Sequence, residues 1–162
     1  ALGGRAIAPE PSDALRARVD DAGHVLVGVG ARTERLGPPG DRYFAPRVGP
    51  EERFVAFQGL SSGLYLHDLD RGVTYHLAQG GGHARFDPAG RWLVFERLED
   101  DGHVFTAGDV MIVDLQPEVP AMAPLVATDA LERAPDLAGG RLSYLRGNEG
   151  VEVVVAELAF TR

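Results

Sequence analysis

The sequence predicts an all-β fold, and three observations support this prediction. The 162 residues include 21 glycines and 11 prolines, about a fifth of the chain, which is typical of short strands joined by many turns. Residues 83–95 have the pattern of a β-hairpin, with aromatic and β-branched residues on both sides of a turn at residues 87–90. The same strand–turn–strand pattern occurs three more times, so the chain is expected to consist of repeated β units.

The turn at residues 87–90 has the sequence Asp-Pro-Ala-Gly. Proline suits the second position of such a turn because its φ is already fixed near the required value, and glycine suits the last position. In each of the four copies an apolar residue precedes the turn, and a basic residue or histidine follows it. The preceding residues are Val19, Val48, Phe86 and Leu137, and the following residues are His24, Arg53, Arg91 and Arg141.

Further strands are expected after the hairpins. Apolar segments at residues 64–69, 110–115 and 151–156 provide a third strand, and residues 73–77 and 125–128 provide a fourth. Four antiparallel strands in about 40 residues are typical of a β-propeller blade, and blades form their core by stacking on each other. The expected units are 12–44, 45–82, 83–133 and 134–162, the first of which is too short for four strands.

The hairpin units resemble the β-propeller repeats of the periplasmic TolB family, also called PD40 or WD40-like repeats. Residues 86–95 and the third strands that end in Asp68-Leu69 and Asp114-Leu115 carry the resemblance, which covers about residues 14–160. Asp87 replaces the usual serine of the family pattern, and Ala89 replaces the usual aspartate. The resemblance implies a bacterial propeller in the periplasm or another extracytoplasmic compartment, and a cytoplasmic location stays open.

Three arrangements of the units are compatible with the repeats. The chain forms a small closed ring in which residues 1–11 complete the last blade, or half of a ring completed by a second copy, or part of a longer protein. The uneven lengths of the units favour the second and third arrangements. An uncovered blade face would then attract a partner.

Composition excludes several classes of partner and chemistry. A net charge of −8 argues against nucleic acids and anionic membrane surfaces, both of which require a basic face. The chain has no cysteine, and therefore neither a disulfide nor a thiolate site. No apolar run is long enough to span a membrane. We predict no catalytic residue, no metal site and no cofactor.

Two motifs suggest chemistry but fit a structural role better. Residues 59–63, Gly-Leu-Ser-Ser-Gly, match the G-x-S-x-G string of serine hydrolases. That mechanism requires a strand–turn–helix context, whereas this segment lies between two predicted strands. The acidic segment 99–103 lacks the alternating ligand spacing of an EF-hand. Both segments are therefore expected to be turns between strands.

The favoured function is a non-enzymatic binding or scaffold module with a protein or peptide partner. Loops on a rigid β frame are the usual recognition elements, and the expected loops are 58–63, 97–109 and 146–150, all at one end of the blades. The candidate binding residues are Gln58, Arg97, Asp100, Asp101, His103 and Arg146. The alternatives are the propeller portion of an enzyme, such as an oligosaccharide lyase or a serine peptidase, and a structural unit that forms oligomers.

Overall fold

The structure, a computed structural model, describes residues 14–147 and 150–159, which form fourteen strands and no helix. The strands form four separate antiparallel sheets of three or four strands each, in sequence order. The predicted all-β fold of propeller-type blades is therefore confirmed. None of the described segments is a helix that would span a membrane.

We number the sheets as blades 1 to 4. Blade 1 contains β1 (Arg16–Val19), β2 (Val25–Val29) and β3 (Arg32–Leu36). Blade 2 contains β4 (Tyr43–Val48), β5 (Phe54–Gly59), β6 (Gly63–Asp68) and β7 (Val73–Ala78). Blade 3 contains β8 (Gly81–Phe86), β9 (Trp92–Asp100), β10 (Phe105–Asp114) and β11 (Ala121–Val126). Blade 4 contains β12 (Glu132–Ala138), β13 (Arg141–Arg146) and β14 (Glu152–Glu157).

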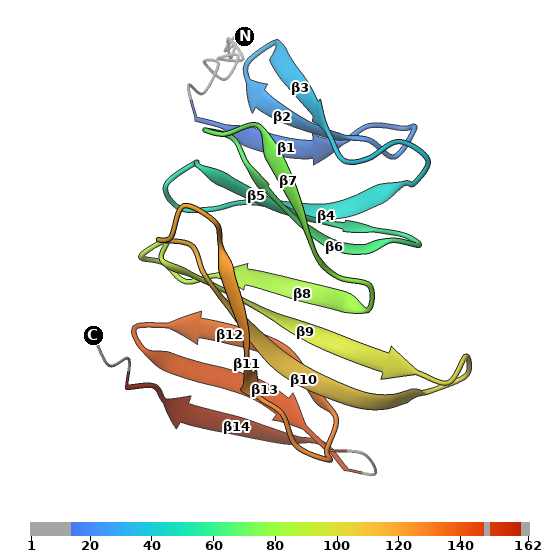
Figure 1. The fold of residues 1–162 in the computed structure, drawn as a ribbon, viewed down its shortest axis with the longest axis vertical. Coiled ribbons are helices and arrows are strands. Elements are labelled where there is room, and N and C mark those ends of the chain that lie inside the picture. Colours follow the sequence, from blue (N-terminus) through green and yellow to red (C-terminus); the bar gives the residue numbers. More distant parts are fainter. Residues whose placement is uncertain (1–13, 148–149, 160–162) are drawn as a thin grey trace, which may run out of the picture.

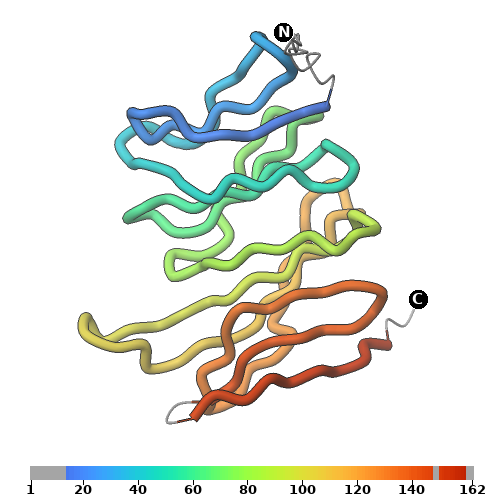
Figure 2. The backbone as a smooth tube through the Cα atoms, turned by 180° about the vertical axis from the view of Figure 1, so that it is seen from behind, coloured from blue at the N-terminus to red at the C-terminus, as the bar shows by residue number. Residues whose placement is uncertain are grey.

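The four blades follow each other along the long axis of the molecule, with blade 1 and blade 4 at opposite ends (Figure 1). In the view from behind, β4, β8 and β12 lie nearest the viewer, and the last strands β7 and β11 lie farther back (Figure 2). We call the edge formed by β4, β8 and β12 the inner edge. The described residues form an open stack rather than a closed ring, and residues 1–11, which were expected to complete the last blade, lie outside them.

The core consists of three layers of side chains, each between two neighbouring blades. In β5, Val55 and Phe57 pack toward blade 1, and Phe54 and Ala56 pack toward blade 3. Both faces of this strand are therefore buried, which explains why its sequence shows an unbroken apolar run instead of alternation. The third layer, between blades 3 and 4, contains Val94, Val110, Ile112, Leu137, Leu142 and Tyr144.

The predicted turn at residues 87–90 is present. The amide of Gly90 donates to the carbonyl of Asp87 at 2.9 Å, and the Asp87 carboxylate accepts from the amides of Ala89 and Trp92. Gly90 has a φ of 75°, a value that glycine adopts without strain. The turn therefore forms for the reason that its residue types suggest.

The first hairpin exists, but it does not occupy the expected place in its blade. In Figure 1, β4, β8 and β12 run in one direction across the stack, and β1 runs in the opposite direction. The turn after β1 contacts the start of the next blade, where the amide of Tyr43 donates to the carbonyl of Gly23 at 2.7 Å. The strands of blade 1 therefore correspond to the second, third and fourth strands of the other blades.

The hydrogen bonds of the turn explain why the sequence suggests that β1 and β2 are the first two strands of a blade. The amide of Gly23 donates to the carbonyl of Asp20, and the Asp20 carboxylate accepts from the amide of His24. The turn at residues 87–90 has the same bond from glycine to the aspartate carbonyl, and its aspartate carboxylate likewise accepts from an amide after the glycine, that of Trp92. The same types of turn residue therefore occur at both ends of a blade. The sequence pattern of a turn does not show which two strands of the blade the turn connects.

The inner edge carries a repeated irregularity. Each of β4, β8 and β12 has a β-bulge where its register with the next strand shifts. At each bulge a non-glycine residue adopts the left-handed region, with φ of 50° at Ala45, 49° at His83 and 50° at Ala134. Such backbone costs about 1–2 kcal/mol per residue and redirects the neighbouring side chains. Three corresponding occurrences on one edge identify it as the place to look for a site.

Candidate functional site: a groove on the inner edge

The bulges border a groove that crosses blades 2, 3 and 4. Its largest hollow has a volume of about 530 Å³, within the range typical of ligand sites. Its lining residues are Phe44, Gln58, Gly82, His83, Glu96, Leu98, Phe105, Arg133, Ala134 and Leu145. We call this hollow, together with the smaller one beside it, the inner-edge groove.

Glu96 stabilises the floor of the groove. Its side chain is buried, with 5% of its surface exposed. Oε1 lies 2.6 Å from Nδ1 of His83, and Oε2 accepts a 2.7 Å hydrogen bond from the amide of Ala134. The carboxylate thus connects the bulge residue of β8 with the bulge residue of β12, and both of its oxygens have a partner.

Gly82 keeps the groove open between two polar side chains. A Cβ atom at this position would lie 3.2 Å from Oε1 of Glu96 and 3.5 Å from Nε2 of Gln58. The residues paired in register with Gln58 and Glu96 are Phe44 and Gly82, respectively, so these two polar side chains occupy corresponding positions of blades 2 and 3. The glycine leaves room for a ligand to approach both.

The walls of the groove are partly apolar. Phe44 is 40% exposed and Phe105 is 52% exposed, although both are large aromatic side chains. Leu98 and Leu145 line the same hollow. Exposed aromatic residues in a concave site are typical of the anchor points of protein–protein interfaces.

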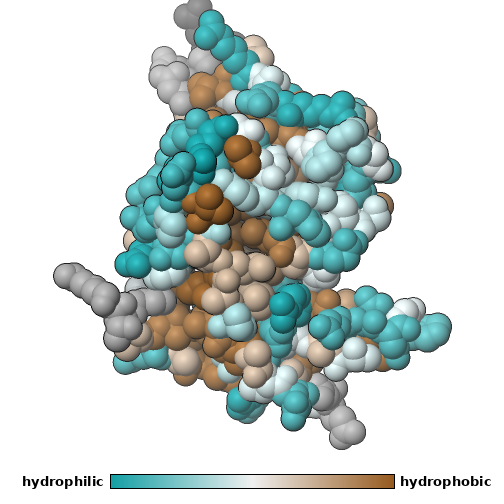
Figure 3. Space-filling view, in the orientation of Figure 1, coloured by the Kyte–Doolittle hydropathy of each residue, from teal (hydrophilic) through white to brown (hydrophobic). Residues whose placement is uncertain are grey.

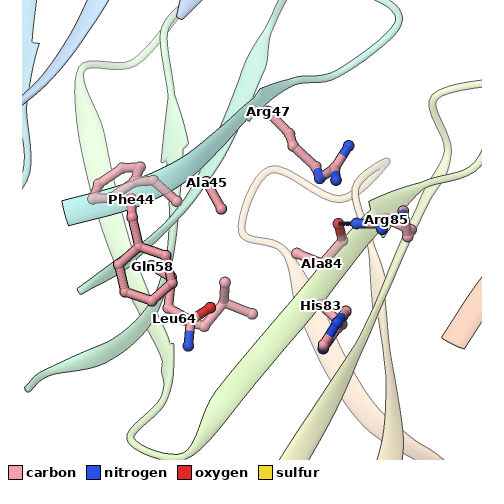
Figure 4. Close-up of a pocket in the computed structure, with 9 residues that line it drawn as sticks. Phe44, Ala45, Arg47, Gln58, Leu64, His83, Ala84 and Arg85 are labelled. Atoms are coloured by element: carbon pink, nitrogen blue, oxygen red, sulfur yellow. Dashed lines mark hydrogen bonds between the residues drawn. The ribbon is translucent and has the colours of Figure 1, made fainter. Parts of the chain in front are cut away.

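The smaller hollow lies between β4 and β8 and has a volume of about 270 Å³. Figure 4 shows Phe44 and Gln58 on one side of it, and Arg85 and His83 on the other side, with Arg47 near its end. Phe44, Gln58 and His83 line both hollows, so the two form one continuous groove. The electrostatic character differs between them, because only the smaller hollow has two arginines in its lining.

Of the candidate residues from the sequence, the structure brings Gln58 into this groove. Asp100, Asp101 and His103 lie at the tip of the β9–β10 hairpin. Asp100 and His103 line a separate, shallow hollow there together with Phe105. Asp101 accepts from the amides of His103 and Val104, and these bonds lower the pKa of its carboxyl. The two aspartates thus hold the turn in shape, because Asp100 accepts from the amide of Gly102.

Arg97 and Arg146 each have a local partner. A guanidinium nitrogen of Arg97 lies 2.5 Å from Oδ2 of Asp109, and Arg146 lies 2.6 Å from Oε1 of Glu152. The hydrogen bond from Arg146 to Glu152 and the attraction between them raise the pKa of Arg146. Both pairs join neighbouring strands of one blade, β9 with β10 and β13 with β14.

The prediction that residues 97–109 form a loop is wrong. Residues 97–100 belong to β9 and residues 105–109 belong to β10, so the segment forms a long hairpin whose turn covers only residues 101–104. Cross-strand pairing of Arg97 with Asp109 stabilises this extension. Charged residues occur both in loops and at exposed positions of paired strands, so the charges of this segment alone do not distinguish a loop from a hairpin.

The two chemical motifs form turns. Gly59 ends β5 and Gly63 begins β6, so residues 60–62 connect the two strands directly. Asp41 accepts hydrogen bonds from the amides of Ser61 and Ser62. This strand–turn–strand context differs from that of a hydrolase nucleophile. Among the described residues, no three histidine, aspartate or glutamate side chains gather in a group that could hold a metal ion.

The comparisons with known proteins found solved structures with a similar fold, and no match by sequence. No protein-family model matches the chain, and no curated protein matches it. A crystal structure of TolB from Acinetobacter baumannii is similar, with a TM-score of 0.48, 16% identity, and coverage of 85% of this chain and 37% of that protein. A putative 6-phosphogluconolactonase from Bacteroides uniformis has a TM-score of 0.48 and 15% identity, with coverage of 85% and 49%. The chain thus spans less than half the length of either protein.

Proposed function

We propose that the chain is a non-enzymatic binding module that holds a protein or peptide segment in the inner-edge groove. The observation that carries this proposal is the 530 Å³ hollow in which two exposed aromatic side chains lie beside polar groups. Phe44 and Phe105 provide apolar anchors, and Gln58 provides an amide for a peptide backbone. Such a combination of apolar surface and few polar groups is typical of recognition sites.

The frame around the groove suits recognition. Its side chains project from strands of blades 2, 3 and 4. Buried layers hold blades 2 and 3 on both faces, and blade 4 on the face toward blade 3. A preformed site loses little conformational entropy when a ligand binds. Asp100, Asp101 and His103 lie at the tip of the hairpin that contributes Phe105, so we include them in the proposal as the rim of the site. We keep Arg97 and Arg146 as rim residues also.

The test is a selection of peptides from a random twelve-residue library displayed on phage. Selected peptides are then measured by fluorescence anisotropy against Phe44→Ala and Phe105→Ser, with Leu60→Ala as the control. Leu60 is 71% exposed and does not line the groove. We expect each groove variant to weaken binding by about tenfold or more, and the control to leave it unchanged. Peptides that bind both groove variants normally would refute the proposal.

A second candidate function is assembly into a larger ring, and the outer face of blade 4 favours it. Val153 and Val155 are 71% and 55% exposed, whereas Val154 between them packs toward blade 3. In Figure 3, hydrophobic surface gathers over the half of the molecule that contains blades 3 and 4. A sheet face of this kind is the type that a further blade covers.

Light scattering tests this assembly. Oligomers that disappear in Val153→Glu with Val155→Glu would support it, and a monomer at all concentrations would count against it. The division into four repeat units and an extracytoplasmic location are part of our proposal and rest on the repeat pattern.

A further inference from the structure

Two arginines in the inner-edge groove have no acidic partner among the described residues. Arg47 and Arg85 each follow a bulge residue by two positions, Ala45 on β4 and His83 on β8. Arg85 donates to the carbonyl of Ala84 at 3.1 Å, and neither arginine forms an ion pair with a described carboxylate. By contrast, five arginines outside the smaller hollow are paired with carboxylates: Arg53, Arg71, Arg91, Arg97 and Arg146.

The two charges lie close enough to affect each other. Partial desolvation of the guanidinium lowers the pKa of Arg47, although the residue as a whole is exposed, and the positive charge of Arg85 lowers the pKa further. Both side chains line the 270 Å³ hollow (Figure 4). Two like charges in a concave, partly desolvated site produce a local positive potential. This potential is notable in a chain whose net charge is −8.

The other charged and titratable groups of the groove do not neutralise this end. Glu96 is the one carboxylate among the lining residues, and it lines the larger hollow but not the smaller one that contains Arg47 and Arg85. Its two oxygens bind His83 and the amide of Ala134. Arg133, which lines the larger hollow, adds a third positive charge, and its buried Nε has no hydrogen-bond partner among the described residues. The groove therefore contains three arginines and one carboxylate whose oxygens are already bound.

We propose that Arg47 and Arg85 form a subsite for a carboxylate group of the bound ligand. This inference rests on the proposed function and deepens it, because it assigns the partner to the class of acidic peptide segments. A guanidinium binds a carboxylate through two parallel N–H···O bonds, and desolvation strengthens such bonds. Since Phe44, Gln58 and His83 line both hollows, one segment reaches both. Its carboxylate lies between β4 and β8, and its apolar residues lie near Phe105.

A small anion tests the subsite without any peptide. Succinate, succinamide and inorganic phosphate are titrated separately into the ¹⁵N-labelled chain, and amide shifts are followed by NMR. We expect succinate to shift the amides of residues 83–85 and succinamide to leave them in place. The double variant Arg47→Gln with Arg85→Gln should remove the shifts. Arg32→Gln, which changes an exposed arginine of β3 without a described acidic partner, should retain them.

Three results of this titration would overturn the proposal. They are the absence of a shift with succinate, equal shifts with succinate and phosphate, and a response that survives in the double variant. Equal response to phosphate would indicate a general anion site instead of one for carboxylates. Because Arg47 is exposed, its substitution is not expected to disturb folding, and circular dichroism of each variant verifies this.

Peptides distinguish the source of the carboxylate. The probes are acetyl-Phe-Leu-Gly-Asp-Glu-amide, its Asn-Gln counterpart, and acetyl-Phe-Leu-Gly-Gly-Gly with a free C-terminus. If side-chain carboxylates bind, we expect the first peptide to bind about 10- to 100-fold more tightly than the second. If a chain terminus binds, the third peptide should show the advantage instead. Equal affinity of all three would overturn the inference.

The proposed function and this inference fail in different ways. Library peptides that contain no carboxylate and bind equally to the wild type and to the double arginine variant would refute the subsite, while loss of binding in Phe44→Ala would still support the groove. Conversely, a response to succinate that depends on both arginines, without any peptide that depends on Phe44 or Phe105, would support the subsite and refute peptide binding in the larger hollow.

Discussion

Glu96 on β9 and His83 on β8 are in direct contact, with 2.6 Å between Oε1 and Nδ1. The second carboxylate oxygen binds the amide of Ala134 on the next blade. Because His83 and Ala134 both have positive φ, the carboxylate holds two strained bulges in place. The shape of the inner-edge groove therefore depends on one buried side chain. Three predictions begin from carboxylate contacts of this type, two about stability and one about a pKa.

The first prediction concerns Glu96 itself. Glu96→Ala leaves the partly buried amide of Ala134 without its acceptor, and an unsatisfied buried donor costs about 1–3 kcal/mol. Glu96→Gln retains one acceptor oxygen and should cost less. Urea unfolding measures both, with the exposed Glu157→Gln as the control. If Glu96→Ala were as stable as the control, the bridge between blades 3 and 4 would have no energetic role.

The second prediction concerns Asp68, which is 0% exposed and receives a 2.7 Å hydrogen bond from Arg53. Burial raises the pKa of Asp68, but the hydrogen bonds from Arg53 and from two backbone amides outweigh burial and leave the pKa below its ordinary value. Because the pKa in the folded state is depressed, the stabilisation is present above the unfolded pKa of about 4 and disappears as the pH falls through the folded pKa.

Asp68→Asn should therefore reduce the free energy of unfolding at pH 7 by about 1.5–3 kcal/mol, the usual range for hydrogen bonds to a charged group, because Arg53 is 27% exposed and the pair is only partly buried. The difference from wild type should shrink below pH 4. The corresponding pair of blade 3, Arg91 with Asp114, is longer at 3.4 Å and more exposed, so Asp114→Asn should cost at most about 1 kcal/mol. Equal losses in the two variants would contradict this ranking. Urea unfolding over a pH series provides the measurement.

The third prediction concerns Asp41, which connects the chain before β4 to the β5–β6 turn. The hydrogen bond from the Ser62 hydroxyl, with further bonds from the amides of Ser61 and Arg42, lowers the pKa of Asp41 to about 2. Ser62→Ala should raise that pKa toward its ordinary value of about 3.9. Carboxyl-carbon NMR titration measures the shift directly, and Ser143→Ala on β13 is the control. A pKa near 4 in the wild type would refute the described contact.

Much of the fold follows from local chemistry that a sequence displays. The turn at residues 87–90 contains its proline, its aspartate and its glycine at the positions that the hydrogen bonds require. Third strands ending in Asp68 and Asp114 were identified from the repeat, and in the structure both carboxylates contact the arginine that follows the first turn of their blade. These features are short-range and recur, so comparison between copies reveals them.

The site depends on features that a single sequence does not display. The bulges at Ala45, His83 and Ala134 have no common residue type, because tertiary packing rather than turn chemistry imposes the positive φ. Gln58 was predicted, and Glu96 was missed although it occupies the corresponding position in blade 3. A polar residue directly after a four-residue apolar run, at 54–57 in one strand and 92–95 in the other, is the signal that would have identified both. Arg47 and Arg85 also stand at corresponding positions, two residues after the bulge residues of β4 and β8.

The last prediction concerns Gly63, the first residue of β6. Its φ is 87°, and a Cβ atom there would lie 2.1 Å from the carbonyl oxygen of Ala78 and 2.3 Å from that of Gln79. Gly72 also has a positive φ, of 64°, but has no atom within 4 Å of the Cβ position. Comparison of alanine variants at these two glycines therefore separates the cost of backbone strain from the cost of a steric clash.

Gly72→Ala introduces strain alone and should reduce the free energy of unfolding by about 1 kcal/mol. Gly63→Ala adds a clash with backbone that does not move easily, so the loss should reach about 2–4 kcal/mol. Thermal and urea unfolding of the two variants provide the comparison. Equal losses would show that the end of β7 does not approach the β5–β6 turn as closely as described. Because residues 78–83 lead from this contact into the bulge of β8, a larger loss in Gly63→Ala should also be accompanied by weaker ligand binding in the inner-edge groove.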